Sequence, residues 1–241
     1  MSCASLKPAA VSPDKPAISN LSAHEFSTTV HAQYSLFLPK GYHPNATNRW
    51  PLIVFLHGIG ECGTDVWQTA VHGPAKYIET HPDFPFIVVS PQCPVGHEWS
   101  DETVLGILDQ ITARYAVDTN QIYLTGLSLG GFGAWSLATY YPERFAAAAL
   151  ISGGDGMIGV IVAAKLNARK RVALRSLPVW AFHCEGDPVV PVVESERMTG
   201  ALKAMGCKEV KLTIYPRAKH DAWTETYDNP ELYQWFLAHR R

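Results

Sequence analysis

Short apolar runs recur along the chain, and each is bounded by glycine, proline or polar residues. Residues 51–56 (PLIVFL) and 145–151 (FAAAALI) are far too short to cross a membrane but have the length of a strand. In these runs the apolar residues are consecutive and do not alternate with polar residues. This pattern is typical of strands buried on both faces. We expect the remaining strands within residues 28–42, 84–94, 121–125, 177–187 and 210–216.

Apolar residues recur at helical spacing between these runs, most clearly in residues 101–115. There Val104, Leu108 and Ile111 lie on one helical face. Asp101 is in position to cap the first turn. Further helices are predicted at 129–141, 194–205 and 230–239.

Strands that are apolar throughout and alternate with helices predict a mainly parallel sheet covered by helices on both faces, an α/β fold. The chain has 241 residues, enough for one large domain, and it contains no internal repeat. We expect a loose tail at residues 1–24, which are rich in Pro, Ala and Ser, followed by a single domain at 25–241.

Composition narrows the choice of partners and compartment. Charged residues make up 17% of the chain and the net charge is −2, so neither nucleic acid nor an anionic membrane is expected as a partner. The first 20 residues contain no apolar leader segment, which favours a cytoplasmic protein as the sequence stands, with a secreted mature form as the alternative.

The five cysteines are odd in number and lack the spacing of metal ligands, which favours a reducing compartment. Cys62 and Cys93 both follow predicted strands that we expect to be neighbours. A disulfide between them and two free thiols both remain open, and the free thiols are the favoured interpretation.

Ser128 stands in the sequence Gly-Leu-Ser-Leu-Gly, directly after a predicted strand and before a predicted helix. The motif alone is weak evidence because glycine and serine are common. In this position, however, it matches the nucleophile elbow, where Gly126 and Gly130 allow strand and helix to approach closely. The N–H of Leu129, at the start of that helix, is a candidate donor to an oxyanion.

A second oxyanion donor is expected from the loop His57-Gly-Ile-Gly, which follows an earlier strand. We favour the N–H of Ile59, with Gly60 as the alternative. His57 precedes the nucleophile in a strand-to-turn context, so we predict that it bonds local backbone rather than acting as the catalytic base.

The orienting acid and the base are expected after the nucleophile, on loops that follow strands. Asp187 is the favoured acid because neighbouring prolines stiffen its loop, while Glu185 and Asp155 are alternatives. After Asp187 only His220 and His239 remain, and His239 lies in the charged terminal helix. His220 is therefore the predicted base. The resulting order of serine, aspartate and histidine is that of hydrolases with a Ser-His-Asp triad.

Together these motifs resemble a small esterase of the α/β-hydrolase fold, over residues 25–241. The likeness is greatest to compact carboxylesterases that are related to phospholipase/carboxylesterases and often catalogued as peptidases. It implies Ser128 as nucleophile, Asp187 as orienting acid and His220 as base, with no metal and no other cofactor. The matching stretches are PLIVFLHGIGECGTD, SPQCP, IYLTGLSLGGFGAW, PERFAAAALISGG, VWAFHCEGDPVVP and HDAWTETYDNPELYQWFLAHRR.

The chain departs from that family in two places. Cys62 stands where we expect a charged residue, and the stretch 155–176 is more apolar and more basic than expected. About twenty residues leave no room for a large cap domain. Within them an apolar helical stripe predicts either a helix packed on the sheet or a small flap beside the active site.

The predicted activity is hydrolysis of a carboxylic ester, of short-chain, acetyl or feruloyl type, on a small molecule or on polysaccharide. Alternatives are a serine peptidase of the prolyl-oligopeptidase type and an inactive binding module on the same scaffold. Candidate substrate contacts are Trp99, Trp223 and Gly60, with polar contributions from His97 and Glu98.

Overall fold

The computed structural model describes residues 29–44, 47–155 and 167–241. The chain divides into two units, Met1–His31 and Ala32–Arg241, and the fold reported below is that of the second unit. The tail predicted at residues 1–24 lies outside the described residues.

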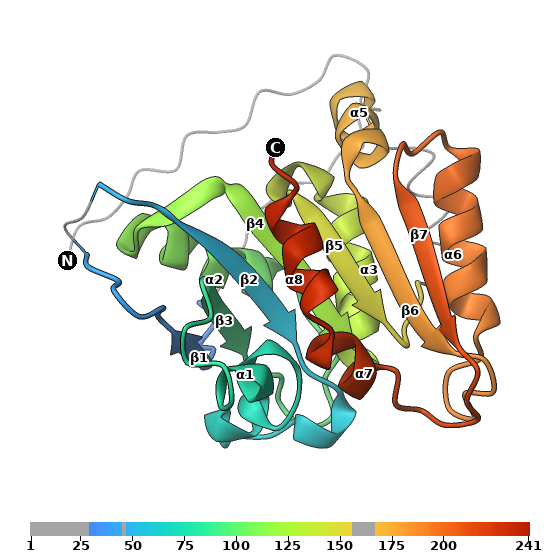
Figure 1. Ribbon diagram of the computed structural model, residues 1–241, viewed down its shortest axis with the longest axis horizontal. Helices are drawn as coiled ribbons and strands as arrows, with labels where there is room; N and C mark the ends of the chain where they lie inside the picture. The colour runs from blue at the N-terminus through green and yellow to red at the C-terminus, as the bar shows by residue number, and fades with distance from the viewer. Residues whose placement is uncertain (1–28, 45–46, 156–166) are drawn as a thin grey trace, which may run out of the picture. The chain divides into compact units, whose positions relative to one another are not determined.

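Seven strands form one sheet in the order β1-β3-β2-β4-β5-β6-β7. β1 is antiparallel to β3, and every other neighbouring pair is parallel, which confirms the predicted mainly parallel sheet. In Figure 1 the arrows of β2, β5, β6 and β7 point the same way. The strands are β1 (Tyr34–Phe37), β2 (Trp50–Leu56), β3 (Ile87–Pro91), β4 (Val117–Leu127), β5 (Ala147–Ile151), β6 (Val179–Cys184) and β7 (Val210–Tyr215).

Each strand lies within or overlaps a predicted run, and β4 differs most from its prediction. It begins at Val117 rather than at residue 121, because Val117 is paired with Trp50 across an irregularity in the register. The residues between Val117 and the apolar run are polar and partly exposed, so the apolar pattern marked only the buried half of this strand.

Four of the seven α-helices within the described residues were predicted, namely α2, α3, α6 and α8. The other three, α1, α5 and α7, are shorter or have little apolar periodicity. The helices are α1 (Gly73–Ile78), α2 (Asp101–Arg114), α3 (Leu129–Tyr140), α5 (Ala168–Ser176), α6 (Val193–Ala204), α7 (Trp223–Asp228) and α8 (Pro230–Leu237).

The cap of α2 corrects a prediction. Ser100, not Asp101, is the capping residue, and its side chain accepts a hydrogen bond from the N–H of Thr103. Asp101 is instead the first helical residue, and its carboxylate accepts a hydrogen bond from Ser136 Oγ of α3. The side chain that caps α2 therefore precedes Asp101 by one residue.

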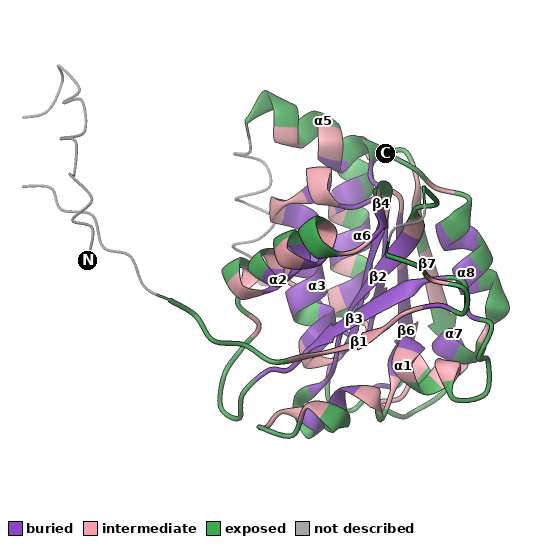
Figure 2. Cartoon of the chain, turned by 90° about the vertical axis from the view of Figure 1, so that its left-hand side faces the viewer, coloured by how far each residue is buried: buried purple, intermediate pink, exposed green. Residues whose placement is uncertain are grey.

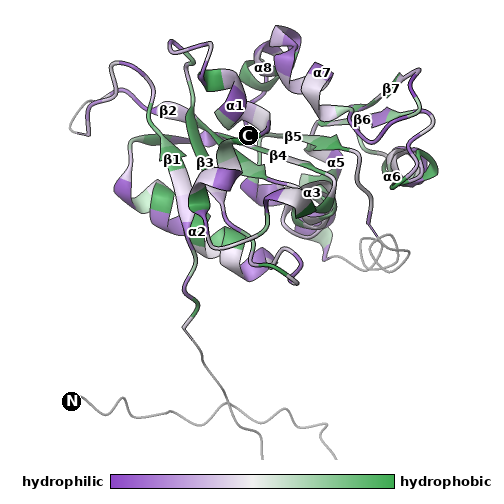
Figure 3. Cartoon of the chain, turned by 90° about the horizontal axis from the view of Figure 1, so that it is seen from below, coloured by the Kyte–Doolittle hydropathy of each residue, from purple (hydrophilic) through white to green (hydrophobic). Residues whose placement is uncertain are grey.

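Helices cover both faces of the sheet, as predicted. In Figure 1, α8 lies in front of the sheet and α3 behind it. One hydrophobic core joins the sheet to α2, α3 and α6 and includes Leu108, Trp135 and Met198. The other joins the sheet to α7 and α8 and includes Tyr227 and Phe236. Figure 2 shows β2 and β3 in the purple of buried residues, and in Figure 3 β3 and β5 are mostly green, the colour of hydrophobic residues.

The carboxyl ends of β2, β4, β6 and β7 meet at one edge of the sheet because these strands are parallel. His57, Ser128, Asp187 and His220 follow these four strands. No large cap covers this edge in the part of the chain that the structure describes. Most of the apolar stripe considered as a flap falls at 156–166, outside the described residues, whereas residues 168–176 form α5, which contributes Leu174 to the core.

Candidate active site

Ser128 occupies a strained turn between β4 and α3. Its backbone has φ 52° and ψ −118°, and Ser128 and Ser152 are the non-glycine residues with positive φ in the described part of the chain. Such a conformation costs about 1–3 kcal/mol and persists only where the surroundings enforce it. One such restraint is the hydrogen bond from Ser128 N–H to the carbonyl of Ile151, at 3.0 Å.

The glycines on either side of Ser128 are required by close backbone contacts. A Cβ on Gly126 would lie 2.2 Å from the carbonyl oxygen of Gly130, and one on Gly130 would lie 2.0 Å from that of Leu56. No side chain fits at those distances. The prediction that these glycines allow strand and helix to approach is confirmed.

A chain of hydrogen bonds connects Ser128, His220 and Asp187. His220 Nε2 lies 2.8 Å from Ser128 Oγ, and His220 Nδ1 lies 2.6 Å from Asp187 Oδ2. Because a carboxylate only accepts, Nδ1 carries the hydrogen, and Nε2 of the neutral ring accepts the hydroxyl hydrogen. The three residues belong to loops after β4, β7 and β6, so the sheet brings together side chains that are distant in sequence.

Asp187 is held by the turn that follows it. Its Oδ1 accepts hydrogen bonds from the N–H groups of Val189 at 2.9 Å and Val190 at 3.0 Å. Its side chain is fully buried, whereas that of the alternative acid Glu185 is exposed. Of the three carboxylates considered from the sequence, Asp187 is the one that hydrogen-bonds His220.

The loop after β2 lies against the serine. A Cβ on Gly58 would lie 3.6 Å from Ser128 Cβ, and the N–H of Gly58 donates to Glu61 Oε2 at 2.9 Å. Ile59 begins the 3₁₀ helix Ile59–Glu61, as Leu129 begins α3. The N–H groups of such first residues have no acceptor within their own helix and can bind an anion.

The candidate donors in this loop differ in their surroundings. The N–H of Gly58 is engaged by the carboxylate, which leaves the following residues of the loop as candidates. Gly60 faces open space, because a Cβ added to it would meet no neighbouring atom within 4 Å. Ile59 is 72% exposed.

His57 has the structural role predicted for it. Its Nδ1 donates to the carbonyl of Gly58 at 2.7 Å, and its Nε2 accepts the N–H of Cys93 at 3.1 Å. Burial lowers the pKa of His57, although its bond to the Gly58 carbonyl and the nearby Glu61 oppose that shift. Both ring nitrogens are therefore used by backbone groups.

The two tryptophans proposed as substrate contacts have different neighbours. Trp99 donates from Nε1 to the carbonyl of His57 at 3.3 Å, and its ring packs edge-on against the His57 ring. Trp223, at the start of α7, packs edge-on against His220, with ring centroids 5.1 Å apart. Trp223 thus touches the triad directly, whereas Trp99 packs beside a structural histidine. His97 and Glu98 are exposed.

Residues 96–229, more than half of the chain, match the family model described as Phospholipase/Carboxylesterase. The chain belongs to the phospholipase/carboxylesterase family. The matched range contains Ser128, Asp187 and His220.

Relatives and solved structures extend this likeness. The chain is 31% identical over 134 residues to poly(3-hydroxyalkanoate) depolymerase C of Paucimonas lemoignei, a match that covers 48% of the chain and 30% of the relative. It is 27% identical over 128 residues to a protein of Aspergillus terreus named "Probable feruloyl esterase C", covering 51% and 46%. The crystal structure of a thermostable esterase has a TM-score of 0.71 and 33% identity, over 89% of this chain and 60% of that one. The chain thus spans less than half the length of these two curated relatives.

Cys62 and Cys93 are free thiols in this family member, in agreement with the favoured interpretation. Each thiol donates to backbone carbonyls, Cys62 to Gly58 and Cys93 to Pro94 and His97. Burial, with a further contribution from the nearby Cys62, raises the pKa of Cys93 to about 12. Burial also raises the pKa of Cys62. The pair lies beside the loop after β2, since Cys62 follows Glu61 directly.

His183, a fully buried residue of β6, is not among the site residues predicted from the sequence. Its Nε2 lies 2.9 Å from the carbonyl oxygen of Val190 and 3.4 Å from Asp187 Oδ2. The available signal was a polar side chain within an otherwise apolar strand, four residues before the acid. The apolar run predicts a buried strand and by itself gives its one histidine no role.

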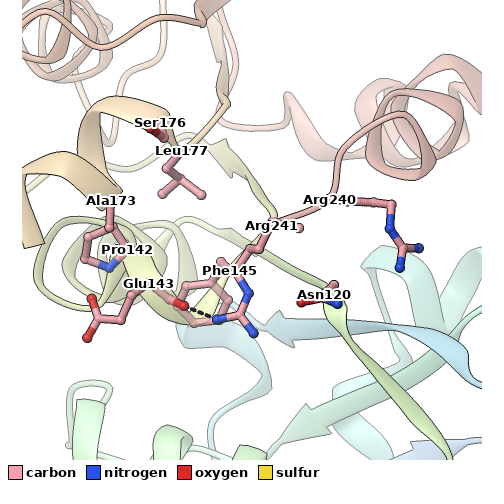
Figure 4. Close-up of a pocket in the computed structure, with 10 residues that line it drawn as sticks. Asn120, Pro142, Glu143, Phe145, Ala173, Ser176, Leu177, Arg240 and Arg241 are labelled. Carbon is pink, nitrogen blue, oxygen red and sulfur yellow. Dashed lines mark hydrogen bonds between the residues drawn. The ribbon is translucent and has the colours of Figure 1, made fainter. Parts of the chain in front are cut away.

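A cavity of about 400 Å³ lies at the other end of the sheet, near the amino ends of β5 and β6. Figure 4 shows Arg241 bonded to the carbonyl of Glu143 at its edge. None of the predicted site residues lines it. The lining residues are Asn120, Pro142, Glu143, Phe145, Ala146, Ala173, Ser176, Leu177, Arg240 and Arg241.

Proposed function

We propose that this member of the phospholipase/carboxylesterase family hydrolyses carboxylic esters with Ser128 as nucleophile, His220 as general base and Asp187 as orienting acid. The observation that carries the proposal is the unbroken hydrogen-bond chain from Ser128 Oγ through the imidazole to a buried carboxylate. The strained turn at Ser128 supports it, because a serine held at that cost at the end of a parallel strand is typical of a nucleophile elbow.

In the acylation half of this mechanism, Ser128 Oγ forms a bond to the ester carbonyl carbon while its proton passes to His220 Nε2. Asp187 keeps the Nδ1–H tautomer in place and stabilises the imidazolium. The tetrahedral intermediate then collapses, its carbon–alkoxy bond breaks, and Nε2 returns the proton to the departing alcohol.

The intermediate carries a negative oxygen that needs donors. The N–H groups of Leu129 and Ile59 are the proposed pair, since both begin helices next to Ser128. Removing one such donor in a serine protease costs about 2.7–4 kcal/mol of transition-state stabilisation. Glu61 holds the Gly58 N–H and so fixes the backbone just before Ile59.

Water completes the cycle by the same route. It attacks the acyl carbon while Nε2 takes its proton, the bond from that carbon to Ser128 Oγ breaks, and the proton returns to Oγ. The products are an alcohol and a carboxylic acid, and Ser128 is regenerated without any added cofactor.

The proposed substrate is an ester of short-chain, acetyl or feruloyl type, free or attached to polysaccharide. Exposed apolar side chains border the triad: Ile59 follows the residue against Ser128, Phe132 is one turn into α3, and Val189 bonds Asp187 through its N–H. With Trp223 against His220, this rim favours an acyl group with an apolar or aromatic body. The relative named as a feruloyl esterase agrees with that choice.

A substrate panel tests this function. The panel contains p-nitrophenyl esters of increasing chain length, methyl ferulate, acetylated xylan and a proline-containing peptide. We expect turnover of the esters and none of the peptide, and labelling of Ser128 by a fluorophosphonate probe, located by mass spectrometry. Cleavage of the peptide alone would favour a peptidase, and absence of both turnover and labelling would indicate a binding module.

A further inference from the structure

His183 lies beneath the triad on the face of β6 that α6 covers. Its side chain is fully buried. Val179 and Ala181, which share its face of the strand, belong to the apolar core beneath α6. An apolar side chain would suit this position, so an imidazole there requires hydrogen-bond partners for both of its nitrogens.

The Nε2 atom of His183 donates a hydrogen bond to the carbonyl oxygen of Val190 at 2.9 Å, because a carbonyl oxygen can only accept. Nε2 also lies 3.4 Å from Asp187 Oδ2, close enough for an electrostatic contact. Asp187 Oδ2 is also the atom that accepts from His220 Nδ1 at 2.6 Å. Two histidines therefore face the same carboxylate oxygen, His183 from β6 and His220 from the loop after β7.

The backbone of Val190 connects His183 to the Asp187 carboxylate. Its N–H donates to Asp187 Oδ1 at 3.0 Å, while its carbonyl accepts from His183. His183 thus fixes the peptide that restrains one carboxylate oxygen and approaches the other oxygen directly. A rotation of the Asp187 carboxylate would disturb both contacts.

The other ring nitrogen anchors His183 to the scaffold. Because Nε2 carries the ring hydrogen, Nδ1 accepts the hydroxyl hydrogen of Ser195, a fully buried residue of α6, at 2.7 Å. Ser195 Oγ also lies 3.3 Å from the carbonyl oxygen of Gly153. The ring is therefore held between Ser195 of α6 and the carbonyl of Val190, and it cannot rotate without breaking a buried hydrogen bond.

We propose that His183 is a positioning residue for ester hydrolysis, which holds the Asp187 carboxylate in the orientation that His220 needs. The inference rests on the proposed function of Asp187 and His220. His183 touches no reacting atom, so its loss lowers kcat and leaves substrate binding unchanged. A misplacement of catalytic groups by about 1 Å can cost about 100-fold in rate, and we expect a loss of about 10- to 100-fold.

Two amide substitutions test the hydrogen bonds of the two ring nitrogens separately. In His183→Gln the amide nitrogen is as far from Cβ, counted in bonds, as Nε2, so the donor to the Val190 carbonyl beside Asp187 is retained. In His183→Asn the amide reaches only the position of Nδ1, so the bond to Ser195 is retained and that donor is lost. We expect His183→Gln to stay within about 3-fold of the parent kcat and His183→Asn to lose about 10- to 100-fold at unchanged KM.

Melting temperature and a matched control complete the experiment. His239→Asn changes a partly buried histidine that bonds Trp235 and Glu209, and we expect its kcat to equal that of the parent. Equal kcat in His183→Gln and His183→Asn, or losses that follow the melting temperatures, would overturn the proposal. In an Asp187→Asn background His183→Asn should cause no further loss, because His183 acts through Asp187.

A measurement on the parent protein does not depend on the folding of variants. Nitrogen-15 NMR of histidine-labelled protein should find a hydrogen on His183 Nε2 throughout the pH range of activity. A His183 Nε2 without hydrogen would contradict the donor role. The activity of Ser128→Ala separates the two proposals. If Ser128→Ala keeps full activity, the proposed triad is wrong. If Ser128→Ala is inactive but His183→Gln and His183→Asn have equal kcat, only the role proposed for His183 is wrong.

Discussion

Two histidine–carboxylate pairs in this molecule have similar geometry but different surroundings. His220 Nδ1 lies 2.6 Å from Asp187, and His239 Nε2 lies 3.1 Å from Glu209. The two rings are almost equally exposed, at 16% and 18%. The Asp187 side chain is fully buried, whereas that of Glu209 is 35% exposed and also binds Trp235 and Lys211.

The difference teaches that a histidine–carboxylate pair does not by itself make a catalytic site. The second nitrogen of His220 faces Ser128 Oγ in a strained turn, whereas that of His239 faces the carbonyl of Trp235. The first pair can therefore move a proton to and from a hydroxyl, and the second can only join α8 to β7. The group that faces the second ring nitrogen of the histidine therefore determines what each pair can do.

The largest contrast is expected between the two histidines. His220→Ala should lower kcat by a factor on the order of 10⁶, because no other group accepts the proton of Ser128 Oγ. His239→Ala should leave kcat within about 3-fold and lower the melting temperature instead, since its part-buried hydrogen bonds to Trp235 and Glu209 are lost. Steady-state kinetics on a p-nitrophenyl ester measure kcat for both variants. A comparable loss of kcat in the two would contradict the different roles assigned to these histidines.

The carboxylates should differ less than the histidines. Asp187→Asn keeps the shape of the side chain but favours the wrong tautomer of His220, and we expect kcat to fall by about 10⁴. Glu209→Gln, the matched change in the other pair, should leave kcat unaffected. Retention of more than a tenth of the parent kcat in Asp187→Asn would contradict the role assigned to Asp187.

The turn that holds Ser128 can be disturbed without changing any side chain of the triad. Gly130→Ala would place a Cβ 2.0 Å from the Leu56 carbonyl oxygen, so the helix behind Ser128 must shift. We expect a loss of about 3 kcal/mol or more in the free energy of unfolding, measured by urea denaturation. Gly106→Ala in α2 is the control, because a Cβ there meets no atom within 4 Å, and it should stabilise the protein by up to about 1 kcal/mol.

The smallest predicted effect concerns the acid dependence of stability at Glu209. Burial alone would raise its pKa, but hydrogen bonds from Trp235, His239 and Lys211 lower it to about 2, from an ordinary value of 4.5. A carboxylate whose pKa is lower in the folded chain stabilises the fold above about pH 4.5, and this contribution is lost as the pH falls toward about 2. The stability gap between the parent and Glu209→Gln, from urea denaturation at pH 6 and pH 3, should therefore shrink at the lower pH. A gap independent of pH would show that Glu209 contributes through packing alone.

Short, uninterrupted apolar runs and helical spacing predicted most of the fold, because β2, β3, β5 and β6 are buried on both faces. The pattern failed where burial is partial. The first residues of β4 are polar, and α1 and α7 have only six residues each, too few to show a period. The cap of α2 was displaced by one residue because serine and aspartate cap helices equally well.

Chain order and loop position were enough to select Ser128, Asp187 and His220 as candidates, since parallel strands gather their carboxyl ends at one edge. Contacts that depend on register between distant strands gave no such signal. The approach of His183 to Asp187 requires the turn that closes at Val190, and the bond from Gly58 to Glu61 requires a 3₁₀ turn. Neither turn has a residue pattern that stands out from the surrounding loop.

The most direct test of the account is the rate of ester hydrolysis by Ser128→Ala, measured on protein whose melting temperature and circular dichroism match those of the parent. The account predicts that kcat falls by a factor on the order of 10⁶ and that the fluorophosphonate label is lost. Hydrolysis at a rate close to that of the parent would contradict it.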